Sequence, residues 1–261
     1  MEIYQVDAFT NQPYKGNPAA VCILDTLQEV SWLTDVAREM SLPETAFLFK
    51  QKDGYNLRWF TPTSEVDLCG HATLASAHVL WETKRVDKTQ DIKFNTKSGL
   101  LVARKNDQWI ELDFPIEAPK EEFAPQILLN ALDVKPIYVG KNRFDYLIEV
   151  ESEEIVKNLD PDFRLLKKVE SRGVIVTSRS SFKRYDFISR FFAPSIGIDE
   201  DPVTGSAHCA LAPYWQNKLN INEFLAYQAS ERGGSLKIRL GDKRVYLSGQ
   251  AVTVLKGDLY H

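Results

Sequence analysis

Hydrophobic residues along the chain fall mainly in short runs that turn residues separate, and several runs alternate with polar residues. This pattern predicts β-strands more often than helices. Strands are expected at 3–6, 19–24, 46–49, 57–60, 92–94, 100–103, 109–114, 136–139, 146–150, 173–177, 185–192, 236–240, 245–247 and 251–255. The polar segments 105–107 and 241–243 have the composition of hairpin turns. The chain is therefore expected to consist largely of β-sheet.

A few segments instead show the helical period. Residues 31–40 place four apolar side chains on one face: Leu33, Val36, Ala37 and Met40. Ser31 is expected to cap this helix, and Pro43 prevents its continuation. Further helices are expected after the cap candidate Ser152 and at Asp160-Pro161, where proline would occupy the first helical position.

Two other segments, 72–82 and 207–216, are small and apolar on almost every face, and each contains a tryptophan near its end. A helix that is apolar all round is buried. Since strands surround both segments in the sequence, the pattern predicts an α+β fold in which a curled sheet wraps a central apolar helix.

The chain contains an internal repeat that joins these features. Arg58-Trp59-Phe60-Thr61-Pro62 recurs as Arg190-Phe191-Phe192-Ala193-Pro194, and 65–72 aligns with 200–207, giving six identities in 13 positions. The offset is close to half the chain length, which indicates two pseudo-symmetric domains. We expect domains 1–117 and 118–261, with the last strand able to return to the first domain. Coincidence between two strand–turn–helix units is the alternative.

Composition and charge narrow the functional classes. The 261 residues are 44% hydrophobic and 26% charged, with 32 Lys and Arg against 36 Asp and Glu, as in an average globular protein. This balance gives no electrostatic reason for binding nucleic acid or an anionic membrane surface. No segment reaches the ~18 apolar residues that a membrane span needs. Neither nucleic acid nor membrane is therefore expected as a partner.

The N-terminus and the cysteines indicate a location. Residues 1–7 mix acidic with alternating apolar residues and lack the basic start of an export signal. The three cysteines are an odd number in a chain long enough to fold without disulfides. Together these features predict a cytoplasmic protein.

Each buried helix begins directly after a glycine turn, Gly70-His71 in the first half and Gly205-Ser206 in the second. A helix N-terminus presents free N–H groups, and glycine allows a ligand to approach them. Two such turns in a cleft between domains, beside Asp201, suit binding of a carboxylate or stabilisation of a carbanion. The alternative is that both are strand-to-helix corners. No glycine-rich phosphate motif occurs, so no nucleotide cofactor is indicated.

Glu44 is the candidate for acid–base chemistry, because it follows Pro43 between apolar residues. Partial burial raises the pKa of a carboxyl group and brings proton exchange towards neutrality. On these residues alone, a loop or helix-end carboxylate is the alternative.

Four motifs occur in order along the chain: Asp7-Ala8-Phe9 with Gly16-Asn17-Pro18-Ala19-Ala20-Val21, Leu42-Pro43-Glu44-Thr45-Ala46-Phe47, Leu68-Cys69-Gly70-His71-Ala72-Thr73, and Glu200-Asp201-Pro202-Val203-Thr204-Gly205-Ser206-Ala207-His208. Together they resemble the PhzF-like phenazine-biosynthesis family from residue 1 to about residue 255. The resemblance implies the diaminopimelate epimerase fold, with two pseudo-symmetric β-barrels or rolls around central helices. It also implies a homodimeric, cofactor-independent isomerase that moves a proton on a small carboxylate substrate.

The resemblance also implies roles for individual residues. Glu44 matches the general acid/base, and His71 matches the histidine after the first glycine turn. Asp201 and Ser206 match the polar pair of the second turn, which hold the substrate and assist proton transfer. The expected catalytic residues are thus Glu44, His71 and Asp201, and the expected substrate-binding residues are Gly70, His71, Gly205 and Ser206.

One departure concerns cysteine. Diaminopimelate epimerases use two facing cysteines, but here Thr204 is the repeat partner of Cys69. Because Cys22 and Cys209 lie elsewhere in the pattern, a two-thiol racemase is disfavoured. Cys69 is expected to be a packed residue, and a role beside Glu44 stays open.

Three rival readings remain. Cys69, His71, His78 and His208 include zinc-ligand types, but no C-x-x-C or H-x-x-x-H spacing occurs, so no metal is expected. A racemase or epimerase of an amino or hydroxy acid would use Glu44 opposite Asp201 or Cys69. A protein that binds a carboxylate without turning it over is the third reading.

Overall fold

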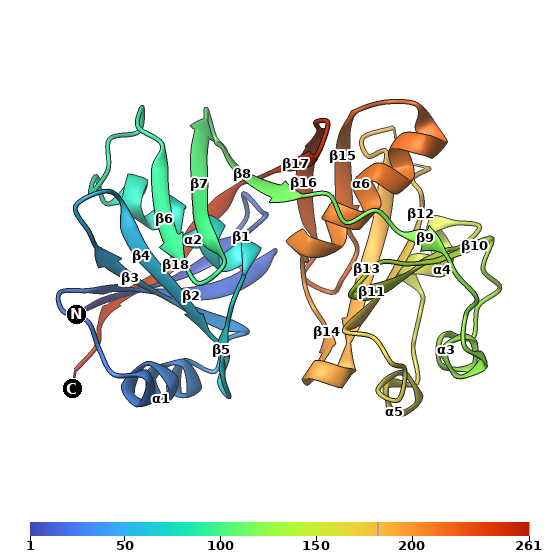
Figure 1. Cartoon of the computed structure of the whole chain (residues 1–261), viewed down its shortest axis with the longest axis horizontal. Helices are drawn as coiled ribbons and strands as arrows, with labels where there is room; N and C mark the ends of the chain where they lie inside the picture. Colours follow the sequence, from blue (N-terminus) through green and yellow to red (C-terminus); the bar gives the residue numbers. More distant parts are fainter. Residues whose placement is uncertain (182, 261) are drawn as a thin grey trace. The chain divides into compact units, whose positions relative to one another are not determined.

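The computed structural model describes residues 1–181 and 183–260 (Figure 1). The described chain forms two compact units, one of residues 1–113 and 248–260 and the other of residues 114–247. The chain thus leaves the first unit after Asp113 and returns to it at Ser248.

The first unit is a curled sheet with two helices (Figure 1). Its strands are β1 (Glu2–Ala8), β2 (Asn17–Leu24), β3 (Glu44–Lys50), β4 (Tyr55–Phe60), β5 (Glu65–Val66), β6 (Ile92–Thr96), β7 (Gly99–Asn106), the start of β8 (Trp109–Pro115) and β18 (Ala251–Asp258). Its helices are α1 (Val30–Met40) and α2 (Gly70–Glu82). Strand β1 pairs antiparallel with β2 and β18, and β2 runs parallel to β3. Strand β4 then pairs antiparallel with β3 and β5 but parallel with β6.

The second unit repeats this order of pairings. Its strands are β9 (Lys120–Glu121), β10 (Tyr138–Lys141), β11 (Asp145–Glu149), β12 (Gly173–Arg179), β13 (Phe187–Ala193), β14 (Ile198–Glu200), β15 (Glu223–Gln228), β16 (Gly234–Leu240) and most of β17 (Arg244–Gly249). Its helices are α3 (Gln126–Leu132), α4 (Glu153–Lys157), α5 (Phe163–Leu166) and α6 (Gly205–Leu219), with a 3₁₀ turn η1 (Pro194–Ile196). Strand β11 runs parallel to β12, and β13 pairs antiparallel with β12 and β14 but parallel with β15. This correspondence confirms the predicted α+β class and the pseudo-symmetric repeat.

The two apolar helices lie at the centres of their units, as predicted. Helix α2 packs against β1, β2, β3 and β18, and its residues from His71 to Ala77 are all buried. Helix α6 packs against β11 and β16, and it continues through Pro213. Trp81 and Trp215 are at most 1% exposed, so each anchors its helix in its own core.

A guanidinium–carboxylate pair repeats in both units. Arg58 of β4 donates from Nε and Nη2 to Glu65 of β5 at 2.7 and 2.9 Å. Arg190 of β13 donates from the same two nitrogens to Glu200 of β14 at 2.7 and 2.8 Å. Bidentate pairs of this kind fix geometry as well as charge. Each one ties a short strand to the strand before it, just ahead of the central helix.

Some local predictions were wrong, and the structure gives the reasons. Ser31 lies inside α1, because the carbonyl of Glu29 already accepts the N–H of Leu33. Asp162, not Asp160, caps α5, since its carboxylate accepts from the next backbone N–H groups. Helix α3 and strand β15 were not predicted. In β15 the buried face ends in Gln228, a polar residue that breaks the apolar alternation.

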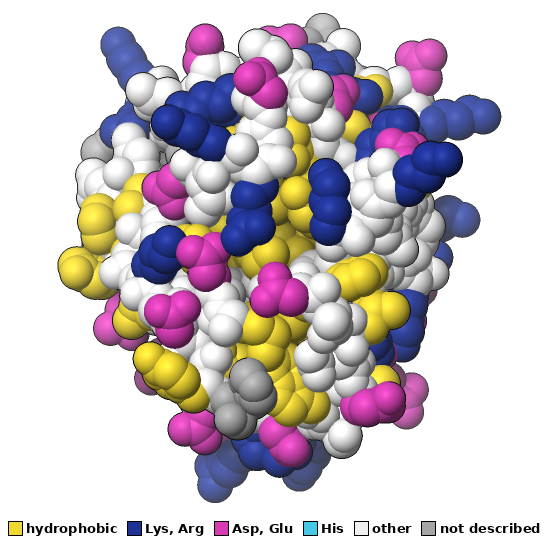
Figure 2. Space-filling view, turned by 90° about the vertical axis from the view of Figure 1, so that its left-hand side faces the viewer, with side chains coloured by type: hydrophobic (Ala, Val, Ile, Leu, Met, Phe, Trp, Pro, Cys, Tyr) yellow, Lys and Arg dark blue, Asp and Glu magenta, His cyan; other side chains and the backbone are white. Residues whose placement is uncertain are grey.

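The surface agrees with the charge balance. One face of the molecule carries Lys and Arg side chains interspersed with Asp and Glu around small apolar areas (Figure 2). Among the described residues, no helix has the length and hydropathy to cross a membrane.

Candidate functional site

Glu44 and His71 meet in the first unit, where two elements begin. Glu44 is the first residue of β3, and its backbone pairs with Ala19 of the parallel strand β2. His71 is the second residue of α2. The Nε2 atom of His71 lies 3.2 Å from Oε2 of Glu44, which is ion-pair distance. The ring N–H is not aligned on that oxygen. Such loose contacts are common in catalytic groups without substrate.

Cys69 lies on the other side of the same ring. It precedes α2 as the N-cap residue, and its Sγ is 3.5 Å from Nδ1 of His71. The imidazole therefore links a carboxylate at one nitrogen to a thiol at the other. Burial raises the pKa of the Cys69 thiol, and the Glu44 carboxylate raises it further.

Burial and charge oppose each other at His71. The side chain of His71 is 7% exposed and that of Glu44 is 13% exposed. Burial by itself lowers the pKa of His71, but the neighbouring Cys69 and Glu44 raise it well above its ordinary value. Because both neighbours favour a proton on the ring, His71 is suited to share a proton with Glu44.

Asn17 completes this cluster, although sequence reasoning gave it no role. It is the first residue of β2 and is fully buried, and its Nδ2 lies 3.2 Å from Nδ1 of His71. Its motif Gly16-Asn17-Pro18 was recognised in the sequence, but no pattern signal connects that motif to His71.

The predicted residues of the second glycine turn gather in the second unit. Oγ1 of Thr204 donates to Oδ2 of Asp201 at 2.5 Å, and the backbone N–H of Thr204 donates to Oε1 of Gln228 at 2.8 Å. Gln228 also donates from Nε2 to the carbonyl of Asp201 at 2.7 Å. Gly205 and Ser206 then begin α6, and Ser206 is half-buried. Thr204 and Gln228 therefore fix Asp201 just ahead of the helix.

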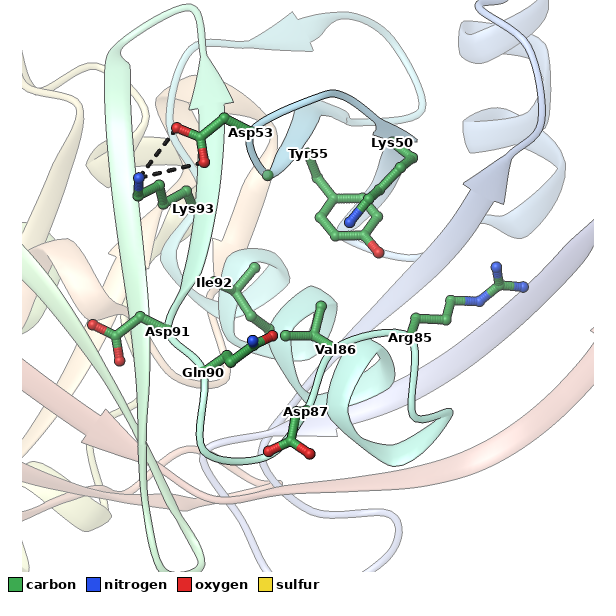
Figure 3. Close-up of a pocket in the computed structure, with 11 residues that line it drawn as sticks. Lys50, Asp53, Tyr55, Arg85, Val86, Asp87, Gln90, Asp91, Ile92 and Lys93 are labelled. Atoms are coloured by element: carbon green, nitrogen blue, oxygen red, sulfur yellow. Dashed lines mark hydrogen bonds and ion pairs between the residues drawn. The ribbon is translucent and has the colours of Figure 1, made fainter.

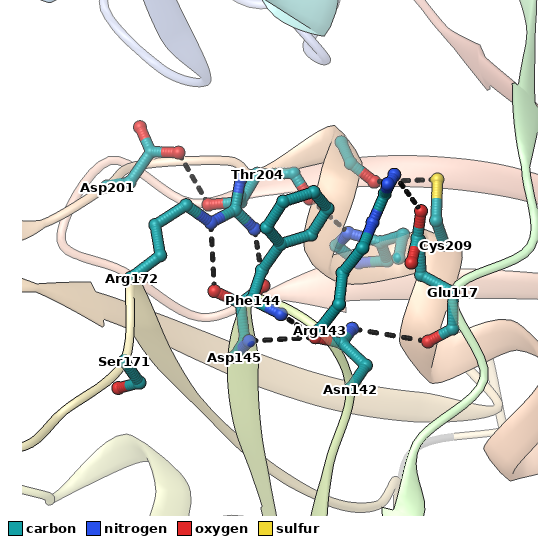
Figure 4. A network of polar contacts seen from close by, with 12 residues as sticks. Glu117, Asn142, Arg143, Phe144, Asp145, Ser171, Arg172, Asp201, Thr204 and Cys209 are labelled. Atoms are coloured by element: carbon teal, nitrogen blue, oxygen red, sulfur yellow. Dashed lines mark hydrogen bonds and ion pairs between the residues drawn. The ribbon is translucent and has the colours of Figure 1, made fainter.

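Ion pairs surround the start of α6 (Figure 4). Arg172 donates from Nε to Oδ1 of the buried Asp145 at 2.9 Å, and its Nη2 bonds the other carboxylate oxygen. Arg143 donates to Glu117 at 2.6 Å, and the N–H of Glu117 donates to the carbonyl of Cys209 in α6. Each guanidinium in this network has a carboxylate partner, so the network holds loops around α6 in place.

The remaining cysteines and histidines have buried surroundings or partners of their own. His208 is fully buried in α6, its Nδ1 lies 2.8 Å from the carbonyl of Thr204, and burial lowers its pKa to about 4. His78 lies 3.7 Å from Glu82. Burial raises the pKa of Cys22 to about 11 and that of Cys209 to about 12. The two thiols are therefore protonated at neutral pH and unsuited to nucleophilic chemistry, and one ring nitrogen of His208 is already occupied by a backbone carbonyl.

Within the described chain, one group has metal-ligand spacing. The ligand atoms of Glu44, Cys69 and His71 lie within 4.8 Å of one another. However, His71 faces the thiol and the carboxylate with different nitrogens, and one metal ion takes only one of them. The geometry fits a proton-sharing group better than a metal centre.

A hollow on the first unit is remote from this chemistry. It has a volume of about 410 Å³ and is lined in part by Lys50, Asp53, Arg85 and Lys93 (Figure 3). Arg85 follows the C-terminal end of α2, whereas His71 is at its start. A helix of 13 residues is roughly 20 Å long. Lys93 is paired with Asp53 at 3.1 Å and Arg85 with Glu2 at 2.7 Å, so those charges are already balanced.

Comparisons with known proteins agree with the fold. Residues 6–257 match the family model described as phenazine biosynthesis-like protein. An uncharacterized isomerase of Halalkalibacterium halodurans is 62% identical over 258 residues, which are 98% of this chain and 97% of that protein. A crystal structure of a PhzF family phenazine biosynthesis protein from Enterococcus faecalis has a TM-score of 0.96 at 41% identity, covering 100% of this chain and 99% of that chain.

A more distant structure shares the fold alone. The hydroxyproline epimerase of Agrobacterium vitis has a TM-score of 0.64 at 10% identity, over 98% of this chain and 91% of that chain. The family match spans most of the sequence, and similar relatives from two bacteria are named isomerases. The chain therefore belongs to the phenazine biosynthesis-like protein family, and it is an isomerase.

Proposed function

We propose that this isomerase needs no cofactor and moves a proton on a small carboxylate substrate, with Glu44 as the general acid/base. One observation carries the proposal: the Glu44 carboxylate is 13% exposed and lies 3.2 Å from Nε2 of His71. A carboxylate that is mostly buried beside a proton-sharing group, yet still reachable, is the arrangement that general acid–base catalysis requires.

The proposed reaction conserves atoms and charge. The Glu44 carboxylate takes a proton from a carbon that a neighbouring group acidifies, and the electron pair of that C–H bond spreads into the conjugated substrate. Glu44, now a carboxylic acid, returns the proton to another carbon. His71 shares its Nε2 proton with Glu44 and so limits the charge change at the carboxylate. Product and substrate differ only in the position of one hydrogen and of the double bonds.

The two helix starts, one in each unit, are each proposed as a carboxylate-binding element. The N–H groups of Gly70 and His71 begin α2, and those of Gly205 and Ser206 begin α6. Such groups attract carboxylates through their N–H bonds and the helix dipole. Asp201, held by Thr204, offers an acceptor for an ammonium or hydroxyl group on the substrate.

A racemase with Cys69 as the second base is less well supported. The thiol lies beyond the His71 ring from Glu44, and burial raises the pKa of that thiol. A second base must be ionised and must face the opposite side of the reacting carbon. Asp201 remains the alternative second base, and the position of the isotope distinguishes the two reactions.

The test is deuterium uptake from D₂O by a panel of amino, hydroxy and cyclohexadienyl carboxylates. Label at a new carbon together with shifted double bonds supports isomerisation. Label at the original carbon with inversion would replace the proposal with racemisation. A compound that binds but takes up no deuterium under any condition would favour a non-catalytic carboxylate-binding protein.

A further inference from the structure

Asn17 contacts the nitrogen of His71 that faces away from Glu44. Its Nδ2 lies 3.2 Å from Nδ1, while Nε2 lies 3.2 Å from the Glu44 carboxylate. The strand register explains the arrangement. Ala19 of β2 pairs with Glu44 of β3, and Asn17 is two residues earlier on the same strand, which places it on the same face as Ala19. Two adjacent parallel strands thus carry Asn17 and Glu44, the two side chains that lie at opposite nitrogens of the His71 ring.

The chemistry of an amide suits this position. When Nδ1 carries no proton, it accepts the amide N–H, and the ring proton is then on Nε2, facing Glu44. When the ring takes a second proton, Nδ1–H needs an acceptor, and the same amide can offer its oxygen after turning about its last bond. An asparagine therefore serves both protonation states, whereas aspartate accepts only and leucine does neither.

The other groups that face the ring do not replace this contact. The titratable neighbours are Glu44 from β3 and Cys69 at the start of α2. The Cys69 thiol is farther from Nδ1, at 3.5 Å, and S–H is a weak donor. Asn17 is also fully buried, so water does not compete for its amide.

We propose that Asn17 is a positioning residue that holds the His71 ring with Nε2 towards Glu44 in both protonation states of the ring. The role in catalysis rests on the proposed function of Glu44, but the contact itself does not. Asn17 touches no reacting atom. It acts through His71.

The first test observes the ring without any substrate. The ¹⁵N shifts of the His71 ring nitrogens are followed against pH in the full chain, which contains four histidines, and assigned with His71→Gln. In Asn17→Asp, the added acceptor should move protonation of His71 to higher pH than in the wild type. In Asn17→Leu, the neutral ring should change from a single tautomer to a mixture of its two tautomers. Cys69→Ala is the control for the tautomer: the neutral ring should keep its single tautomer, while the protonation midpoint falls because a neighbour that raises the pKa of His71 is gone.

Two results would overturn the proposal. One is an unchanged tautomer pattern in both Asn17 variants. The other is a loss of the single tautomer in Cys69→Ala as large as that in Asn17→Leu. If Asn17→Leu does not fold, Asn17→Asp decides alone through the tautomer of the neutral ring, because a carboxylate that faces Nδ1 draws the ring proton to Nδ1, whereas a residue that does not position the ring leaves the proton on Nε2.

The second test measures catalysis. Asn17→Leu should lower kcat for deuterium exchange by about tenfold or more, since small misplacements of catalytic groups have effects of this size, while KM changes little. Asn17→Asp should recover part of kcat with a displaced pH profile. A normal kcat in Asn17→Leu contradicts the positioning role and leaves the function of Glu44 intact. If the ring shifts are as expected but the wild type exchanges no carboxylate, the proposed function is refuted and the contact between Asn17 and His71 is not.

Discussion

Replacing Arg190 by methionine should destabilise the second unit by about 3 kcal/mol. The guanidinium gives Glu200 two hydrogen bonds, at 2.7 and 2.8 Å, and its Nη1 donates to the carbonyl of Leu159 at 2.6 Å. Hydrogen bonds to charged groups contribute roughly 1.5–3 kcal/mol each. The side chains of Arg190 and Glu200 are 12% and 20% exposed, so solvent reduces the effect below that of a fully buried pair.

The corresponding pair of the first unit provides a matched control. Arg58→Met should be milder, about 1–2 kcal/mol, because Lys97 still neutralises Glu65 from 2.5 Å. Methionine keeps much of the apolar packing of the arginine stem, so the comparison isolates the charged group.

The assay is urea unfolding of the wild type, Arg190→Met, Glu200→Gln and the double variant. The double variant should lose less stability than the sum of the single variants, because each single change leaves one charge without its partner. Strict additivity, or an Arg58→Met loss equal to that of Arg190→Met, would refute the reasoning.

Three further predictions concern buried groups. The unfolded chain protonates His208 near pH 6.5, whereas burial lowers the pKa of His208 in the folded chain to about 4. The free energy of unfolding is therefore unaffected by this group above pH 6.5 and falls by about 3 kcal/mol between pH 6.5 and pH 4. His208→Asn should flatten that part of an acid-unfolding series. Gly249→Ala should cost about 1–3 kcal/mol in thermal unfolding, because the new Cβ would lie 2.4 Å from Cδ1 of Phe9; an unchanged Tm would contradict this. Tyr214→Phe should cost about 1–2 kcal/mol in denaturant, since its hydroxyl donates to the buried Glu149, and a neutral effect would mean that the bond contributes nothing.

The sequence predicted the elements whose signal is local. Helix α2 is apolar on every face, and the repeat around Arg58 and Arg190 was visible because spacing and residue type agree. The hairpin turns at 105–107 and 241–243 were also predicted, since short polar segments with Asp, Asn or Gly between two strands form turns.

Other features depend on contacts between distant segments. Strand β15 was missed because its buried face includes the polar residue Gln228. The hydrogen bonds of Gln228 to Asp201 and Thr204 satisfy its amide in the interior, and a hydrophobicity pattern cannot reveal them. The role of Asn17 has the same origin, because its partner His71 lies 54 residues away. The expected homodimer and cytoplasmic location stay predictions.

Glu44 is proposed to carry the proton, and a comparison of three proteins tests this role. The rate of deuterium exchange should be measured for the wild type, Glu44→Gln and the exposed-carboxylate control Glu39→Gln, on a carboxylate that calorimetry shows all three to bind. General acid–base groups contribute roughly 10²- to 10⁴-fold. We therefore expect a loss of at least about 100-fold in Glu44→Gln and no change in Glu39→Gln. Exchange that continues at the wild-type rate in Glu44→Gln would contradict it and direct attention to Asp201.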